Sequence, residues 1–234
     1  MHRHYNVNAG KKALTVSQKE RKAAIEKAKQ HDAFRTPRYV FRHLIEQHPY
    51  LFTPKRTERI LDPSAGDGRY IAMLIKEFGL NKVGHCLVDI RKSELKVWEA
   101  KTILTGCVKR IGNFFEQKTR GRFTMAITNP PFRHSKAFIE KMLDSVVDGG
   151  IVIVFEKLAF LGGQNRAAWL DKDMPLKYTI IIPYRIAFDI DGVVQSDPPM
   201  YCFAFYVFQK GFEGEARIRY IHKEEKSVVK RKKK

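Results

Sequence analysis

The sequence is poor in cysteine, in long apolar runs and in acidic residues, and each shortage narrows the class of protein. Its three cysteines, Cys86, Cys107 and Cys202, are an odd number at wide spacing, which fits neither a disulfide framework nor a zinc motif. We therefore expect reduced and mostly buried thiols, as in a cytoplasmic or nuclear protein. No apolar run approaches the ~18 residues of a membrane span. The first residues, MHRHYNVNAGKK, lack the apolar stretch of a signal peptide.

Acidic residues are few beside the basic ones. The 25 Asp and Glu residues face 44 Lys and Arg residues, so the formal net charge is +19. A charge this positive favours a polyanionic partner, most often nucleic acid, ahead of an anionic membrane. A solvated basic surface is the plainer interpretation. The eight histidines show no H-E-x-x-H or similar spacing, so we expect no metal site.

The 234 residues suit one domain with small additions. We assign residues 1–33 to a basic N-terminal extension, 34–222 to the main domain and 223–234 to a basic tail. A capping box, SQKE at 17–20, predicts a helix over residues 18–30. We expect the basic ends to give non-specific, salt-sensitive affinity for a polyanion.

Strand patterns alternate with helix patterns from residue 36 onward. Strands are predicted at ERILD, KVGHCLVDI, VKRIGN, RFTMAITN, IVIVFE, KYTIIIP and YCFAFYVFQ. Helices are predicted at TPRYVFRHLIEQH, GRYIAMLIKEFG (closed by Gly79), SELKVWEAKTILTG and SKAFIEKMLDSVVDGG (ended by Gly149 and Gly150). This alternation predicts a mostly parallel sheet covered on both faces, with the last two strands as an antiparallel hairpin at its edge. Ligands of such sheets bind beyond the carboxyl ends of the strands.

The first strand is followed by DPSAGDG (62–68) and a helix. Gly66 and Gly68 let the backbone approach a ligand, and the helix presents its N–H groups there. Asp62 and Asp67 make the turn negative, which suits a ligand with a cationic part better than a pyrophosphate. The stretch is not G-x-G-x-x-G, so it does not favour a dinucleotide. A plain glycine-rich turn is the alternative.

The next two strand ends also carry polar residues. Asp89 closes the second strand, 21 residues after Gly68, and an acid there can bind a ribose diol. A helix-capping role before RKSEL is the alternative. The third strand ends in GNFF, where Asn113 and Phe114 are placed to hold the edge and face of an adenine. Adjacent phenylalanines are more often core residues.

The fourth strand ends in TNPPF (128–132), which combines an amide, two prolines and an aromatic ring. DPSAGDG followed by NPPF at this spacing resembles the class I S-adenosylmethionine-dependent methyltransferases, specifically the amino-methyltransferases of DNA adenine type. FRTP (34–37) resembles the segment that closes over the methionine end of the cofactor in that branch. FLGGQNR (160–166) and YCFAFYVFQKG (201–211) are similar to small phage-encoded methylases. The resemblance covers residues 34–211.

The resemblance implies a Rossmann-like class I methyltransferase fold: a mostly parallel seven-stranded sheet with a C-terminal antiparallel hairpin and helices on both faces. The chain departs from the family's pattern in two ways. Asn113 stands where the third-strand motif usually has an aspartate, and there is no room for a separate recognition domain of a hundred residues or more. Strict sequence specificity is therefore not expected.

The resemblance also implies roles for individual residues. Asn129 and the Pro130 carbonyl would accept hydrogen bonds from an exocyclic amine, Pro131 would stiffen the turn, and Phe132 would stack on the target base. S-adenosylmethionine would be bound by Thr36, Pro37, Asp62, Pro63, Ser64, Ala65, Gly66, Asp67, Gly68, Asp89, Ile90, Asn113 and Phe114. Nucleic acid would be bound by Phe132, Arg133, Arg166 and Arg185. An ordinary surface loop is the alternative for the segment around Gly162, Gly163 and Arg166.

The function implied is transfer of a methyl group to the N6 amine of adenine in DNA, with a flipped-out base and low sequence specificity. The alternatives are the same chemistry on RNA, a protein-glutamine methyltransferase, or a catalytically silent nucleic-acid-binding subunit. No cysteine follows a proline, which argues against cytosine C5 chemistry. We expect a cytoplasmic protein of a bacterium or a phage-infected cell, or a nuclear protein in a eukaryote. The sequence sets no oligomeric state.

Overall fold

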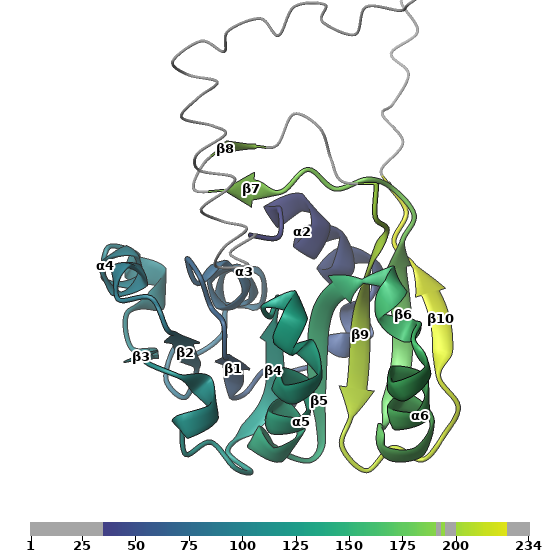
Figure 1. The fold of residues 1–234 in the computed structure, drawn as a ribbon. Coiled ribbons are helices and arrows are strands. Elements are labelled where there is room, and N and C mark those ends of the chain that lie inside the picture. The colour runs from purple at the N-terminus through teal and green to yellow at the C-terminus, as the bar shows by residue number, and fades with distance from the viewer. Residues whose placement is uncertain (1–34, 191–192, 195–199, 224–234) are drawn as a thin grey trace, which may run out of the picture.

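The computed structural model describes residues 35–190, 193–194 and 200–223, and its centre is an eight-stranded sheet (Figure 1). The helix predicted over 18–30 and residues 224–234 of the predicted tail lie outside the described residues. The strand order is β10-β6-β9-β5-β4-β1-β2-β3. These strands are β1 (Ile60–Asp62), β2 (Cys86–Asp89), β3 (Val108–Ile111), β4 (Phe123–Thr128), β5 (Val146–Lys157), β6 (Leu176–Ile182), β9 (Phe203–Gln209) and β10 (Arg217–Tyr220).

The sheet is parallel except for β9, which runs antiparallel to both β5 and β6. The predicted α/β architecture with an antiparallel end is therefore confirmed. A separate small hairpin pairs β7 (Asp189–Ile190) with β8 (Val193–Val194).

Helices cover both faces of the sheet, as predicted (Figure 1). One apolar cluster packs α2 (Arg38–Gln47), α3 (Arg69–Phe78) and Trp98 of α4 (Ser93–Glu99) against the first face. The second cluster packs α5 (Ser135–Ser145) and α6 (Gln164–Asp173) against the other. Pro37 immediately precedes α2, and Gly79 ends α3 with a φ of +60°, both as the sequence predicts.

The strand count was wrong by one. The eighth strand, β10, pairs in parallel with β6, and all four of its residues are exposed. Its sequence, RIRY, offers too short an alternation and too little burial to mark a strand. The predicted edge hairpin is also displaced inward, because β9 inserts between β5 and β6 and β10 forms the edge.

Two helix boundaries differ from prediction. The helix expected to run to Gly149 and Gly150 ends at Ser145, and β5 begins at Val146, which pairs with Phe123. The β-branched pair of Val146 and Val147 favours this extended start. The helix expected over SELKVWEAKTILTG stops at Glu99 and is followed by a short 3-10 turn, η2 (Thr102–Leu104).

The segment FLGGQNR was considered as a loop, but the structure folds part of it into a helix. Leu158–Leu161 form the 3-10 turn η5, and α6 begins at Gln164 directly after Gly163, whose φ is +98°. Arg166 therefore lies in the first turn of a helix. The cysteines agree with expectation: all three are free, Cys86 and Cys107 are buried, and Cys202 is exposed.

Candidate functional site

The loop after β1 is joined to the end of β4 by a buried carboxylate. Asp62 has no exposed surface. Its Oδ1 accepts hydrogen bonds from the Thr128 hydroxyl at 2.8 Å and the Ser64 N–H at 3.3 Å. Its Oδ2 has no hydrogen-bond partner among the described residues. The DPSAGDG loop is thus fixed directly beside the strand end that carries NPPF, with one acceptor oxygen left over.

Burial raises the pKa of Asp62 to about 8, and the nearby Asp89 and Asp67 carboxylates add to the rise. The hydrogen bonds from Thr128 and Ser64 oppose it without cancelling it. A carboxyl group of this kind gains most from a cation placed against its second oxygen.

Asp67 behaves differently from Asp62. Burial acts to raise its pKa, but the hydrogen bonds and charge of Arg69 and the charge of Lys101 outweigh burial and lower the pKa to about 2. The Arg69 Nε lies 2.9 Å from Asp67 Oδ1, and Lys101 Nζ lies 3.3 Å from Oδ2. Arg69 also donates to the Thr36 carbonyl at 2.7 Å, and the Tyr70 hydroxyl donates to the Thr36 hydroxyl at 2.7 Å. Asp67 therefore anchors Thr36 beside the loop through Arg69.

The two glycines of the loop serve different purposes. Gly66, with a φ of +53°, donates its N–H to Asp89 Oδ2 at 2.9 Å. Gly68 has a φ of +75°, and a Cβ there would lie 2.8 Å from side-chain atoms of Leu87 and Leu104. Close packing of the core thus requires a glycine at 68, a reason that differs from the ligand approach considered in the sequence.

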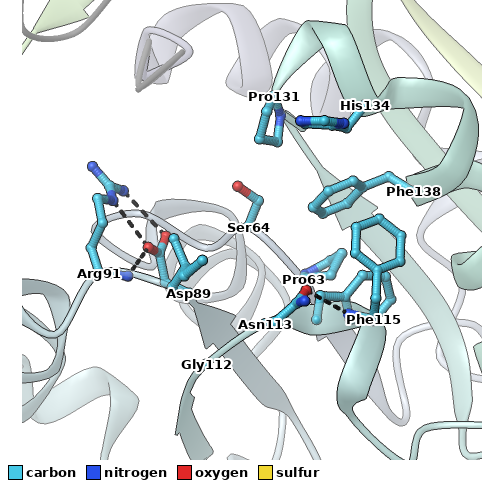
Figure 2. Close-up of a pocket in the computed structure, with 12 residues that line it drawn as sticks. Pro63, Ser64, Asp89, Arg91, Gly112, Asn113, Phe115, Pro131, His134 and Phe138 are labelled. Atoms are coloured by element: carbon cyan, nitrogen blue, oxygen red, sulfur yellow. Dashed lines mark hydrogen bonds and ion pairs between the residues drawn. The ribbon is translucent and has the colours of Figure 1, made fainter. Parts of the chain in front are cut away.

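Asp89 is held by Arg91 (Figure 2) as well as by Gly66. Its Oδ1 accepts from the Arg91 N–H at 2.9 Å and Nε at 3.0 Å, and its Oδ2 accepts from Arg91 Nη2 at 3.2 Å. Arg91 also pairs with the buried Glu94 at 3.2 Å. The carboxylate predicted to bind a ribose diol therefore has its lone pairs engaged, mainly by one partly exposed guanidinium.

A hollow of about 400 Å³ opens beside Asp89 at the carboxyl ends of β2 and β3 (Figure 2). Ile90 lines it and is 72% exposed, so it offers an apolar surface to a flat ring. The Asn113 side chain caps the 3-10 turn η3 (Phe114–Glu116), accepting from the Phe115 N–H at 3.0 Å. The lining residues are Pro63, Ser64, Asp89, Ile90, Arg91, Gly112, Asn113, Phe114, Phe115, Pro131, His134 and Phe138.

The NPPF turn lies where this hollow meets two others. Pro131 lines this hollow beside Asp89. Asn129 lines a small one of about 40 Å³, together with Arg35, Thr36, Ser64, Ala65, Gly66, Asp67, Arg69, Tyr70 and Arg91. Phe132 lines a third, of about 410 Å³, together with Arg133, Glu156, Lys157, Ala159, Phe160 and Arg166. Three successive parts of one rigid turn thus face three separate spaces.

The turn is fixed from the side of β5. The Ser135 hydroxyl contacts the Phe132 carbonyl at 3.1 Å and hydrogen-bonds to the buried Glu156 carboxylate. Lys157 Nζ lies 4.7 Å from the centre of the Phe132 ring, and Phe203 packs beside the same ring at 6.1 Å. Glu156 and Lys157 were not among the predicted site residues. The signal that could have found them is a pair of charged residues directly after the apolar run IVIVF, at the end of a strand where ligands of such sheets bind.

Most of the residues predicted for the site gather around the three hollows. The exceptions start with four buried residues that line none of the three hollows: Pro37, Asp62, Gly68 and Pro130. Arg185 is exposed after β6 and does not line these hollows. Within the described ranges, no cluster of His, Cys, Asp or Glu suits a metal ion, and no helix is long and apolar enough to span a membrane.

Solved structures share this fold at low sequence identity. A candidate class I S-adenosylmethionine-dependent methyltransferase from Listeria monocytogenes is 13% identical, with a TM-score of 0.58 over 80% of this chain and 65% of that one. A candidate RNA methyltransferase from Pyrococcus horikoshii is 18% identical, with a TM-score of 0.57 over 76% and 86%. The methyltransferase subunit of a type I restriction-modification system from Streptococcus thermophilus is 14% identical, with a TM-score of 0.57 over 76% and 45%.

These likenesses show that the chain has the Rossmann-like methyltransferase fold. The chain spans less than two thirds of the Listeria protein and less than half of the Streptococcus subunit. No family model and no curated protein sequence matches the chain.

The residues that line these hollows suit a ligand that has a nucleoside part and a cationic amino-acid part. The hollow beside Asp89 offers an apolar rim, an acid and an amide, which suit a nucleoside. The small hollow is bordered by the loop that Asp62 supports, and Asp62 Oδ2 is buried without a partner among the described residues. A cationic group bound in the small hollow would favour the ionised form of Asp62, whose pKa burial raises to about 8 in the free protein.

Proposed function

We propose that the protein transfers a methyl group from S-adenosylmethionine to the N6 amine of adenine in DNA, with a flipped-out base and low sequence specificity. One observation supports the proposal: Asn129, Pro131 and Phe132 of a single turn line the small hollow, the hollow beside Asp89 and a basic hollow respectively. The turn is thus bordered on one side by spaces that suit the cofactor and on the other by a space that suits a nucleotide.

The chain's own residues supply the activation of the amine. An exocyclic amine is a poor nucleophile because its lone pair is delocalised into the ring. The Asn129 side-chain oxygen and the Pro130 carbonyl accept hydrogen bonds from its two N–H groups and so localise the lone pair toward the methyl group. Because two prolines stiffen the turn, these acceptors need little reorganisation during reaction. The bound cofactor supplies the methyl group on a sulfonium, which is a good leaving group.

The basic hollow is the proposed place of the target nucleotide. Its wall carries the Phe132 ring for stacking and the cations Arg133, Lys157 and Arg166 for phosphates. For a base to stack on Phe132, the Lys157 ammonium that now lies 4.7 Å from the ring centre has to move aside. An adenine and its flanking phosphate would thus replace a cation–π contact with stacking and an ion pair.

A second candidate is the same chemistry on RNA. The match to the candidate RNA methyltransferase covers 86% of that chain, whereas the restriction-modification subunit is matched over only 45%. The chain is thus closer in size to the former. Both polymers suit a net charge of +19.

Transfer of a tritiated methyl group from S-adenosylmethionine to unmethylated DNA, with RNA in parallel, tests the proposal. Nucleoside mass spectrometry of the product should find N6-methyladenine in DNA. The same modified base in RNA alone would favour the second candidate. If neither polymer is labelled while cofactor binding is measurable, a protein substrate or a catalytically silent subunit is the better account.

Arg91→Ala should tighten cofactor binding about twofold to fivefold. The reason is that the ribose diol has to displace Arg91 from Asp89, and a partly exposed ion pair is worth up to ~1 kcal/mol. Titration calorimetry with S-adenosylhomocysteine measures the effect, with the exposed neighbour Lys92→Ala as the control. Weaker binding by Arg91→Ala would instead make the guanidinium a cofactor ligand.

A further inference from the structure

β10 forms one edge of the sheet, separated by β6, β9 and β5 from β4, which carries the NPPF turn at its end (Figure 1). Cations and aromatic rings gather at this edge. The edge cluster, as we call it, consists of Tyr50, Arg56, Lys177, Tyr178, Arg217 and Arg219. Arg217 is paired in register with Tyr178. The Tyr178 ring centre lies 5.6 Å from that of Tyr50, 5.9 Å from Arg219 Cζ and 5.9 Å from Lys177 Nζ. Arg56 donates to the Tyr50 carbonyl at 2.6 Å.

The four cations of the edge cluster have no acidic partner among the described residues. Two exposed cations elsewhere do have an acidic partner: Arg120 lies 3.2 Å from Asp144, and Lys136 lies 3.9 Å from Glu140. Partial burial lowers the pKa of Lys177, and the charges of Arg56 and Arg217 lower it further. Like charges held this close repel one another in the free protein, and this repulsion destabilises the fold. An anionic partner would remove the repulsion.

The aromatic rings indicate which polyanion fits. Tyr50 is 40% exposed, and Tyr178 is partly exposed beside it. A duplex presents phosphates and stacked bases, so it makes no use of an exposed ring, whereas a single strand stacks its bases on aromatic side chains between cations. The edge cluster has this combination of rings and unpaired cations.

The position of the edge cluster is compatible with the same polymer reaching the catalytic turn. In the sheet order, β10 is four strand spacings from β4, which carries NPPF, or roughly 19 Å at ~4.8 Å per spacing. About six nucleotides cover that distance at the ~3.4 Å spacing of a duplex strand, and fewer do so when a strand is extended.

We infer that the edge cluster is a second nucleic-acid contact, which binds a single-stranded segment of the substrate polymer outside the catalytic centre. The inference rests on the proposed function for the identity of the polymer but not for the binding itself. It assigns Arg217 and Arg219 to phosphates and Tyr50 to base stacking.

Fluorescence anisotropy with labelled single-stranded and duplex oligonucleotides, without cofactor and over a range of salt concentrations, tests the inference. The double variant Arg217→Ser/Arg219→Ser should flatten the slope of log affinity against log salt by about 1.4 for the single strand. Affinity should fall about 25-fold at 0.1 M salt, because each lost contact is worth ~0.7 log units there. Lys96→Ser/Lys172→Ser removes the same charge from two exposed helix positions and should change both quantities less.

A second variant separates stacking from charge. Tyr50→Leu should weaken single-strand binding about 5-fold to 150-fold, from a loss of ~1–3 kcal/mol, with the salt slope and duplex affinity unchanged. Tyr50→Phe keeps the ring and should restore binding. Thermal unfolding of each variant checks that it is folded.

Several results would overturn the inference. They are absence of single-strand binding by the wild type, an unchanged slope in the double arginine variant, or an equal loss in the lysine control. Equal losses on duplex, or binding only to vesicles of anionic lipid, would reject the single strand as the partner. The methyl-transfer assay is separate, so a wild type that binds but does not methylate would count against the proposed function alone.

Discussion

Asn129→Ala is expected to lower methyl transfer by about 10²–10³-fold while cofactor affinity stays within about twofold of wild type. Removing one preorganised hydrogen-bonding group of an active site typically costs this much in turnover. Asn129 borders the small hollow, which suits the cationic part of the cofactor, but the hollow beside Asp89, which suits the nucleoside, keeps all its lining residues in this variant. Turnover and cofactor affinity should therefore separate in this variant.

The measurement combines single-turnover methyl transfer with calorimetric titration of S-adenosylhomocysteine. Asn81→Ala is the matched control, because it removes an exposed amide whose oxygen accepts from the Val83 N–H at 3.1 Å. Wild-type turnover in Asn129→Ala would reject the catalytic role of the NPPF turn. Loss of both turnover and cofactor binding would make Asn129 a cofactor ligand instead.

The sequence predicted the parts of the fold that depend on local patterns. The helix after DPSAGDG ends at Gly79, which adopts a left-handed backbone conformation. Glycine is the usual residue in that conformation at a helix end, so the end could be predicted from the sequence. Apolar runs such as FTMAIT and IVIVF are buried on both faces of a parallel sheet, so their strands were also evident. The motifs at the strand ends followed from these strands, because the topology brings carboxyl ends to one edge.

The features that the sequence did not predict depend on distant contacts. β10 is a strand only because β6 offers its edge, since RIRY buries none of its residues. The role of Glu156 is visible only from its hydrogen bond with Ser135, which lies 21 residues earlier in the chain. The hydrogen bonds between Arg91 and Asp89 likewise depend on a side-chain rotamer, which residue spacing cannot reveal. Tertiary contacts, rather than propensities, decide such features.

Asp62 should make the stability of the free protein fall as pH rises. Its pKa is about 8 in the folded protein against a usual value of 3.8, so between these values the folded state holds a proton that the unfolded state lacks. Unfolding then releases a proton, and stability falls by up to ~1.4 kcal/mol per pH unit until the pH passes about 8. Asp62→Asn removes this dependence and keeps the shape of the side chain. The melting temperature of Asp62→Asn should therefore exceed that of wild type by a margin that grows from pH 5 to pH 8.

The same carboxyl group should give cofactor binding the opposite dependence on pH. A cationic ligand group favours the ionised form of Asp62, so affinity should rise up to tenfold per pH unit below about 8 and then level off. Calorimetry of S-adenosylmethionine binding from pH 6 to pH 9 measures this slope. In buffers of different ionisation enthalpy it also counts the proton released. Asp62→Asn should bind weakly with little slope, and its greater stability excludes unfolding as the cause. A wild-type affinity independent of pH would show that Asp62 does not sense the charge of the ligand.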